Sequence, residues 1–433
     1  SLCNLIGNMI DSINGDLSGE EAYRTMSDVK VDLQLMIDKP NQFLSDIEID
    51  KLAVSGLLQL DEYELGRDDE FLTLQGSYAR SISGGNECGV IIGPAGIGKS
   101  VLANRLGSFV TASGGLFLSG KFDQMKQPTP FAALASAFNK YCDEMASEWR
   151  SAMLEVVSSK LRAALGMDAR YLVKIIPKLS GILGDGDIQP TEAQDCVDAQ
   201  KRLQYLLCQF VDIIGSFSGA PIILFLDDVQ WADKASISVI QQLLMSSGSS
   251  NTGRQFYFLA SCRNEGMINE HPFKDMLTSI HSFGVNTTTV TLTCFDNEAI
   301  NTMISDVMCL SPRLTRSLSE IIYNKSGGNP LFFSQLMLSL NRDGLVKFSL
   351  SRRRWTWDEE QIQSTKLPDD VATFLSCSIQ RLPAEVREAL FTLACFGASS
   401  DCFLISSLED KLGSPLIAPL DIAVTAGLLD KID

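Results

Sequence analysis

A short glycine-rich segment carries the strongest chemical signal in this sequence. Residues 93–100 read G-P-A-G-I-G-K-S, which has the G-x-x-x-x-G-K-S spacing of a phosphate-binding loop. Glycines let backbone N–H groups turn toward an anion, and a helix that begins at the end of the loop adds partial positive charge. Lys99 is expected to reach the β- and γ-phosphates of a nucleotide, and the Ser100 hydroxyl is expected to ligate Mg²⁺. The alternative is an ordinary glycine-rich turn between a strand and a helix. The predicted nucleotide-binding residues here are Gly93, Pro94, Ala95, Gly96, Ile97, Gly98, Lys99, Ser100 and Val101.

Two adjacent carboxylates can complete such a site. The apolar run at residues 222–226 leads directly into Asp227 and Asp228. A carboxylate at the end of a strand can bind Mg²⁺, so Asp227 is the predicted metal ligand together with Ser100. Asp228 is the candidate that orients and polarises an attacking water. Alone, the pair also fits a strand capped by acids, but together with the glycine-rich loop it predicts a hydrolytic Mg²⁺–nucleotide site.

Arg263 is the third candidate for the chemistry. It follows the apolar run Phe256–Cys262. A polar side chain at the tip of a strand beside the metal-binding strand can reach a γ-phosphate, so Arg263 is predicted to distinguish ATP from ADP. A solvent-facing arginine after a strand is the alternative. The predicted catalytic residues are therefore Lys99, Asp228 and Arg263, and Arg254 is no more than a candidate for an arginine that acts on a neighbouring subunit.

These residues need a sheet that brings the ends of several strands together. Five short apolar or β-branched runs predict strands, and most of them lie between helical stretches. Nearly continuous apolarity indicates strands buried on both faces, as in a parallel sheet covered by helices. The predicted strands are Cys88–Ile92, Leu116–Phe122, Ile222–Asp227, Phe256–Cys262 and Thr288–Thr293.

Apolar residues at a spacing of three and four predict helices in most of the remaining chain. The clearest stripe runs from Leu203 to Ile214, inside a helical insertion between the second and third strands. A β-hairpin is predicted at residues 345–357. The other predicted helices are Val29–Ile37, Asp61–Arg80, Asp296–Val307, Pro312–Asn324, Leu331–Asn341, Asp369–Leu382 and Glu385–Phe396.

The composition limits the classes of protein that fit. A length of 433 residues suggests two or three domains, and 45% hydrophobic with 21% charged residues is typical of a globular chain. The net charge of −17 disfavours a surface that coats nucleic acid, so nucleic acid is not an expected partner. No apolar run approaches the roughly 18 residues that a membrane span requires, so no membrane partner is expected either.

Cysteine usage points to a reducing compartment. The eleven cysteines are odd in number, contain no C-x-x-C pair and mostly lie in apolar runs, which argues against a disulfide framework and predicts a cytoplasmic location. With only two histidines, a His-rich metal site is not expected. The chain begins at Ser1 rather than Met, which suggests a piece of a longer polypeptide.

Several strings resemble the STAND branch of the AAA-related P-loop ATPases. L-D-D-V-Q-W-A-D at 226–233 is similar to that branch's Walker B region, G-R-D-D-E at 66–70 to its G-R-x-x-E motif, and G-N-P-L-F-F at 328–333 to its G-N-P-F-F motif. G-K-F-D-Q at 120–124 and P-T-E-A-Q at 190–194 resemble ATPase modules inside very large signalling proteins. Those proteins carry a kinase-like domain upstream and often GAF, histidine-kinase or cyclase domains downstream.

The resemblance implies an α/β fold of the P-loop NTPase type. It predicts a parallel five-stranded sheet of the additional-strand type, flanked by helices and followed by a helical lid and a partial winged-helix-like domain. The implied divisions are a linker after an upstream kinase-like domain at 1–60, an ATPase domain at 61–295 with a helical insertion at about 131–217, a lid at 296–343, and a β-hairpin with a winged-helix-like domain at 344–433.

The resemblance also implies a function and further site residues. In relatives, the G-R motif and the proline of the G-N-P motif flank the adenine. The resemblance therefore adds four residues to the predicted nucleotide-binding set: Gly66, Arg67, Asn329 and Pro330. The implied function is a slow regulatory ATPase that uses ATP, ADP and Mg²⁺ as a switch. The implied partners are other domains of the same chain and, in the ATP form, further copies of it.

Two other functions remain open at this point. A nucleotide-binding scaffold without hydrolysis fits the loop, but the intact pair of aspartates speaks against it. A DNA-associated AAA-type ATPase also fits the motifs, but the acidic balance and the lack of a basic helix near residues 366–433 speak against it.

Overall fold

The structure is a computed structural model in which the chain forms two compact units, residues 67–293 and residues 1–66 with 294–433. Several predicted features lie outside the described residues: the string at 190–194, Gln124, the candidate Arg254, residues 61–65 of the helix predicted at 61–80, and most of the helix predicted at 369–382. The structure describes residues 2–14, 23, 25–40, 66–123, 130–148, 151–183, 196–218, 221–247, 255–264, 271–350, 354–364, 373, 376, 379–397, 400, 402–425 and 428–429.

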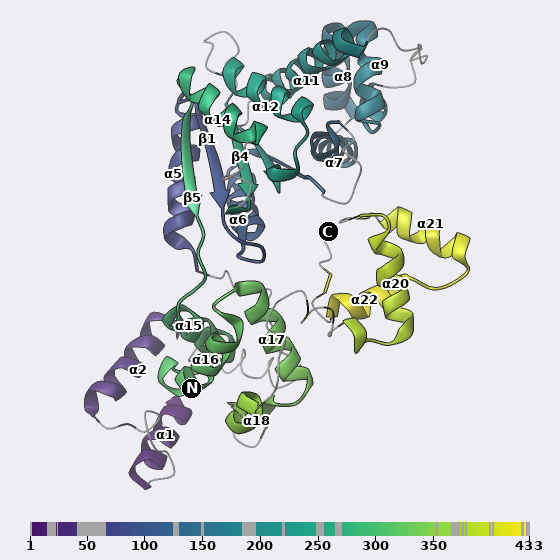
Figure 1. Ribbon diagram of the computed structural model, residues 1–433. Coiled ribbons are helices and arrows are strands. Elements are labelled where there is room, and N and C mark those ends of the chain that lie inside the picture. Colours follow the sequence, from purple (N-terminus) through teal and green to yellow (C-terminus); the bar gives the residue numbers. More distant parts are fainter. Residues whose placement is uncertain are drawn as a thin grey trace. The chain divides into compact units, whose positions relative to one another are not determined.

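A parallel five-stranded sheet forms the centre of the unit at 67–293, with strand order β2-β3-β4-β1-β5 (Figure 1). Every neighbouring pair in this sheet is parallel. β4 lies between β1 and β3, which confirms the additional-strand arrangement expected from the sequence. All five predicted strands are confirmed, with ends shifted by at most two residues. Their bounds are β1 Glu87–Ile92, β2 Leu116–Lys121, β3 Ile222–Asp227, β4 Phe256–Cys262 and β5 Asn286–Thr291.

Helices cover both faces of this sheet because successive strand residues point to opposite sides. On β3, Ile223 and Phe225 pack into the core shared with α5 and α6, whereas Leu224 and Leu226 pack into the core on the other face. α5 runs along the β1 and β5 side of the sheet (Figure 1). The covering helices are α5 Asp68–Ile82 and α6 Lys99–Ala112 on one face, and α7 Ala132–Glu148, α12 Lys234–Ser247 and α14 Pro272–Ser282 on the other.

The predicted insertion between the second and third strands is helical where it is described. Leu206, Leu207 and Phe210 of its long helix are buried, as the apolar stripe in the sequence predicts. The helices that follow α7 are α8 Ser151–Leu165, α9 Ala169–Ile175, α10 Leu179–Leu183 and α11 Cys196–Ser218. They extend the core on the α7 side of the sheet.

A close approach fixes the end of β2. A Cβ atom on Gly120 would lie 2.1 Å from the carbonyl oxygen of Ala133, so α7 begins directly against the last residues of this strand. Only glycine permits that contact, because a larger residue would have to push the backbone of α7 away. The position of the strand tip, which carries Lys121, is thereby set by packing.

Between residues 294 and 364, the described part of the second unit forms three helices, a small antiparallel hairpin and a short fourth helix. Phe333, Trp355 and Ile322 lie in its main core, and the pairing of β6 with β7 confirms the predicted hairpin. The predicted helices of this region are also confirmed. The elements are α15 Asn297–Met308, α16 Pro312–Ser326, α17 Pro330–Arg342, β6 Val346–Ser349, β7 Arg354–Trp357 and α18 Glu359–Ser364.

Two N-terminal helices, α1 Leu2–Asn14 and α2 Met26–Asp38, belong to this second unit. Asp32 of α2 is 3% exposed and accepts hydrogen bonds from the Tyr23 hydroxyl and the Ser311 hydroxyl, each at 2.6 Å. The Arg313 guanidinium lies 4.0 Å from the Tyr23 ring centroid, and Lys39 pairs with Asp306 at 2.8 Å. Within the segment predicted as a linker, α2 and Lys39 are therefore attached to α15 and α16 by polar contacts, of which those at Asp32 are buried.

The C-terminal helices form a small core of their own. Ala389, Leu416 and Leu420 are its buried members. The helices are α20 Ala384–Ala394, α21 Cys402–Leu412 and α22 Ile417–Thr425. They fit the helical part of the predicted winged-helix-like domain, and that assignment stays a prediction. Across the described parts of the chain, every helix is too short or too polar to span a membrane.

Candidate functional site

The glycine-rich loop connects the end of β1 to the start of α6, as the motif requires. Gly96 and Gly98 have φ angles of 73° and 95°, a region that favours glycine, and Gly98 directly precedes α6. Gly93 lies close to the chain: a Cβ there would be 2.9 Å from Ile97 Cγ2 and 3.0 Å from the Leu292 carbonyl oxygen. The loop thus has the tight backbone path that exposes N–H groups to a phosphate.

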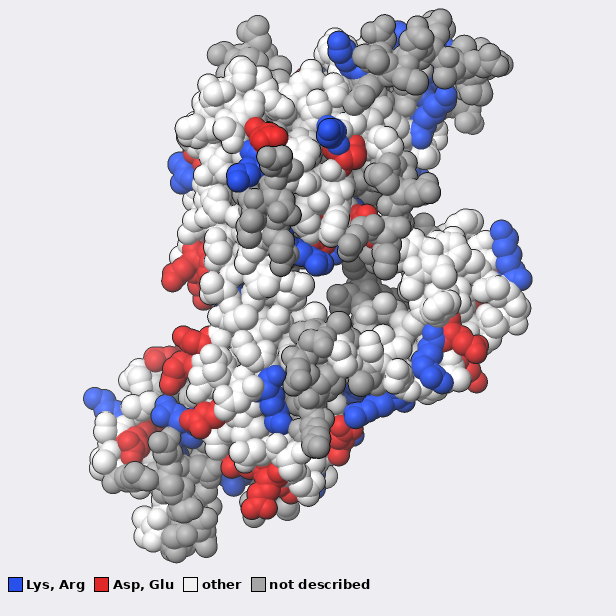
Figure 2. Space-filling view, in the orientation of Figure 1, with Lys and Arg blue, Asp and Glu red and all other residues white. Residues whose placement is uncertain are grey.

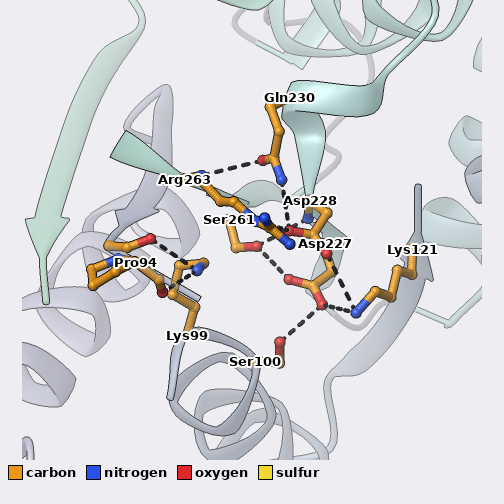
Figure 3. Close-up of polar contacts among 10 residues, drawn as sticks. Pro94, Lys99, Ser100, Lys121, Asp227, Asp228, Gln230, Ser261 and Arg263 are labelled. Atoms are coloured by element: carbon orange, nitrogen blue, oxygen red, sulfur yellow. Dashed lines mark hydrogen bonds and ion pairs between the residues drawn. The ribbon is translucent and has the colours of Figure 1, made fainter. Parts of the chain in front are cut away.

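Lys99 is folded onto the loop that precedes it. Its side chain is buried, and Nζ donates hydrogen bonds to the carbonyl oxygens of Gly93 at 3.0 Å and Pro94 at 2.9 Å (Figure 3). Burial lowers the pKa of Lys99, although the charges of Asp228 and Asp227 act in the opposite direction. Two carbonyl partners hold the ammonium group at the mouth of the loop, where a phosphate can replace them.

Asp227 is held from two sides at the end of β3. Ser100 Oγ donates to its Oδ2 at 2.8 Å, and Ser261 Oγ, from β4, donates to its Oδ1 (Figure 3). The carboxylate is 6% exposed. The two predicted metal ligands, Ser100 and Asp227, are therefore brought into direct contact by loop and sheet.

Asp228 has a different backbone and different partners. Its φ of 56° turns the chain out of the strand, and its N–H donates to Ser261 Oγ at 3.1 Å. Gln230 Nε2 donates to Asp228 Oδ1 at 2.7 Å, while Gln230 Oε1 accepts from the Arg263 N–H at 3.2 Å. The left-handed turn thus directs the two neighbouring carboxylates to separate positions.

Arg263 lies beside this pair, where the sequence analysis expected a residue that senses the γ-phosphate. Its Nε is 4.0 Å from Asp228 Oδ1, and its side chain is 39% exposed. The arginine is one of the charges that influence Lys99, so loop, aspartates and Arg263 share one electrostatic environment.

Sequence reasoning missed three residues of this site: Lys121, Ser261 and Gln230. Lys121 Nζ lies 3.3 Å from Asp227 Oδ2 and 3.4 Å from Asp228 Oδ2. Partial burial works against the charged form of Lys121, but the two aspartates outweigh it and raise its pKa. The position of Lys121 near the end of the second predicted strand could have indicated its role, because Lys121 pairs in register with Asp227 in the parallel sheet.

The four flanking residues predicted from the resemblance are divided between the units: Arg67 belongs to the sheet unit, and Gly66, Asn329 and Pro330 belong to the second unit. Gly66 and Gly328 both approach Phe295: a Cβ on Gly66 would lie 3.6 Å from its ring, and one on Gly328 would lie 2.0 Å from its carbonyl oxygen. Asn329 caps α17 by accepting from the Phe332 N–H at 3.2 Å, and Pro330 is the first residue of that helix. Gly66 and Gly328 therefore both lie against Phe295 within the second unit, and the contact of the G-R and G-N-P motifs with adenine stays a prediction.

Arg67 belongs to the sheet unit and is oriented by local contacts. Its φ is 69°, Nη1 pairs with Glu70 Oε1 at 3.0 Å, and Nη2 donates to the Thr293 carbonyl oxygen. Arg67 and Thr293 are the first and last residues of this unit. The arginine thus ties together the two points at which the chain leaves it.

The donor set fits Mg²⁺ and a nucleotide. Ser100 Oγ and Asp227 Oδ2 are hard oxygen ligands 2.8 Å apart, next to a loop whose glycines leave room for phosphates. Mg²⁺ commonly takes one or two protein ligands and completes its shell with phosphates and water. The residues present therefore suit a magnesium nucleotide, with Lys99 at its phosphate end.

Comparison with known proteins agrees with this geometry. Residues 65–253 match the family model for the AAA ATPase domain. A curated relative, the hybrid signal transduction histidine kinase G of Dictyostelium discoideum, is 23% identical over 86% of this chain, and the match spans only 12% of that protein's length.

Solved structures with a similar path of the chain include the ORC2 protein of Aeropyrum pernix and a Walker-type ATPase of Pyrococcus abyssi. The first has 13% identity and a TM-score of 0.43, with 86% of this chain and 88% of that chain covered. The second has 13% identity and a TM-score of 0.40, with 87% and 94% covered. These scores add no detail to the fold described above.

Proposed function

We propose that the chain is a slow, regulatory Mg²⁺-dependent ATPase module of a multidomain signalling protein. The observation that carries the proposal is the cluster beside the glycine-rich loop, in which Ser100 and Ser261 both donate to Asp227 and Ser261 also accepts from the Asp228 N–H. Oxygen ligands, a base candidate and a phosphate-binding lysine are the parts that nucleotide hydrolysis requires.

Each residue has a distinct role in the proposed reaction. The loop N–H groups and Lys99 bind the phosphates, and Ser100 with Asp227 holds the metal. Asp228 accepts a hydrogen bond from the attacking water and polarises it, while Arg263 stabilises charge on the γ-phosphate. When bound, Mg²⁺ neutralises charge on the β- and γ-phosphate oxygens.

The regulatory part of the proposal rests on context. The curated relative is a signal transduction histidine kinase many times longer than the matched segment, which supports other domains of the same chain as partners. Gly66 of the G-R motif and Gly328 of the G-N-P motif both lie against Phe295, which supports a nucleotide-dependent change in the helices that follow the sheet. A nucleotide-dependent homo-oligomer and a cytoplasmic location remain parts of the proposal.

The described residues on the face drawn in Figure 2 do not form the basic patch expected of a nucleic-acid interface. On the face drawn in Figure 2, lysines and arginines among the described residues alternate with acidic side chains rather than gathering in one patch. A nucleic-acid-binding face would be expected to concentrate basic residues.

Two variants test the proposed function. Lys99→Ala removes a charge-assisted contact worth about 1.5–3 kcal/mol, so ATP binding should weaken about 10- to 150-fold. Asp228→Asn keeps the size of the side chain and should retain binding while turnover falls about 100-fold or more. Binding is measured with a fluorescent ATP analogue and turnover by phosphate release.

Two results would contradict this reasoning. If Lys99→Ala binds ATP as tightly as the parent, the glycine-rich loop is not the phosphate-binding loop. Phosphate release by the parent no faster than by Asp228→Asn would favour a nucleotide-binding scaffold over an ATPase.

A further inference from the structure

A single lysine lies within ion-pair distance of both aspartates of the candidate site. Lys121 Nζ lies 3.3 Å from Asp227 Oδ2 and 3.4 Å from Asp228 Oδ2 (Figure 3). We propose that Lys121 is a displaceable internal counter-ion that occupies the metal's place and must withdraw before the site can work. The inference rests on the proposed function of this site and adds a residue that regulates it.

Lys121 and a metal ion compete for the same oxygen. Asp227 Oδ2 accepts the hydrogen bond from Ser100 Oγ at 2.8 Å, so this oxygen faces the predicted metal position. Two cations cannot share one carboxylate oxygen at contact distance without strong repulsion. Metal binding at Asp227 therefore requires Lys121 to leave.

The same lysine also masks the candidate base. Asp228 Oδ1 already accepts from Gln230 Nε2 at 2.7 Å, and Lys121 faces Oδ2. Gln230 is held at its other end by the Arg263 N–H, so it is not the partner that can move. When Lys121 withdraws, Oδ2 of Asp228 becomes available to water. The same movement vacates the metal position at Asp227, so metal binding and exposure of the candidate base occur together.

The position of Lys121 makes this movement inexpensive. It is the last residue of β2, which lies beside β3 at the edge of the sheet that the described strands form. Its side chain is 51% exposed, whereas Lys99 is 7% exposed and donates to two carbonyl oxygens. The flexible stem of Lys121 can turn into water without repacking, while its Cα stays fixed by the contact between Gly120 and α7.

The test measures metal dependence rather than turnover. The affinity for a fluorescent, non-hydrolysable ATP analogue is determined over a series of free Mg²⁺ concentrations for the parent and Lys121→Met. Loss of the competing charge should lower the half-saturating Mg²⁺ concentration about three- to tenfold, with unchanged affinity at saturating Mg²⁺. Lys121→Gln repeats the measurement if the Met variant does not fold.

Two control variants show whether the effect depends on the charge at position 121. Lys121→Arg keeps the positive charge, so it should not lower the half-saturating Mg²⁺ concentration. Lys140→Met removes an exposed lysine of α7, paired with Glu144 at 4.0 Å, and should also leave the Mg²⁺ dependence unchanged.

Each failure has its own meaning. If the half-saturating Mg²⁺ concentration of both uncharged variants stays within about twofold of the parent value, the role of Lys121 is wrong. The proposed function would then still stand. A rise in that concentration would also overturn the inference, because Lys121 would then be assisting the metal nucleotide. A parent that binds no nucleotide at any Mg²⁺ concentration would overturn the proposed function and this inference with it.

Discussion

Ser261 should be as important to the site as the charged residues that it positions. Ser261 is fully buried, and its hydroxyl donates to Asp227 Oδ1. The Ser261 Oγ atom also accepts a hydrogen bond from the Asp228 N–H at 3.1 Å. Ser261→Ala removes one hydrogen bond to a carboxylate and leaves a backbone N–H without its partner. A hydrogen bond to a charged group contributes about 1.5–3 kcal/mol, so we expect a loss of about 2–4 kcal/mol in the free energy of unfolding.

The functional effect should exceed what lost stability explains. A residue that orients a metal ligand typically contributes 10- to 100-fold to metal affinity or activity, so we expect phosphate release by Ser261→Ala to fall by about that factor. The assays are urea unfolding followed by circular dichroism and phosphate release at saturating ATP and Mg²⁺, well below the urea midpoint.

Ser236→Ala provides the matched control. Ser236 is also fully buried, but its hydroxyl donates to Asp233 Oδ2 at 2.5 Å, and Asp233 is outside the candidate site. The control should lose stability and keep its turnover. If both variants lose turnover equally, or if Ser261→Ala loses none, the positioning role of Ser261 is wrong.

Two further predictions concern buried carboxylates that support the fold. Glu87 is 3% exposed and accepts hydrogen bonds from Arg80 and Ser77. Burial raises the pKa of Glu87, but these two partners outweigh the effect of burial and hold the pKa below that of an ordinary glutamate. Its stabilisation is therefore present above about pH 4.5 and lost as pH falls, so Glu87→Gln should be about 2 kcal/mol less stable than the parent at pH 7. Urea unfolding at pH 7 and pH 4 should show that difference shrinking; an equal difference at both would contradict the assignment. Asp32→Ala should lower the unfolding free energy of the second unit by about 3 kcal/mol and speed proteolysis of α2, whereas Asp38→Ala, at an exposed position of the same helix, should do neither. Equal protease resistance of Asp32→Ala and the parent would show that α2 is held by other contacts.

Local sequence was sufficient for much of this structure. The loop at 93–100 needs a strand before it and a helix after it, and each is encoded by adjacent residues, so β1 and α6 could be predicted from the sequence. Nearly continuous apolar runs likewise predicted β3 and β4, since strands buried on both faces are apolar along most of their length. Asp227 and Asp228 were identified because they end such a run.

The candidate phosphate loop, the strands and the two aspartates could be predicted from local sequence, whereas the side chains that surround them are set by the fold. Lys121 and Ser261 are far from Asp227 in sequence and reach it because β2 and β4 flank β3 in the sheet. Strand order and register arise from packing over the whole unit, and the apolar runs of β2 and β4 do not encode their neighbours. The same reason explains α2, whose single buried carboxylate finds Ser311 and Arg313 only after the chain has folded. Local pattern thus encodes elements, whereas the site depends on contacts between elements distant along the chain.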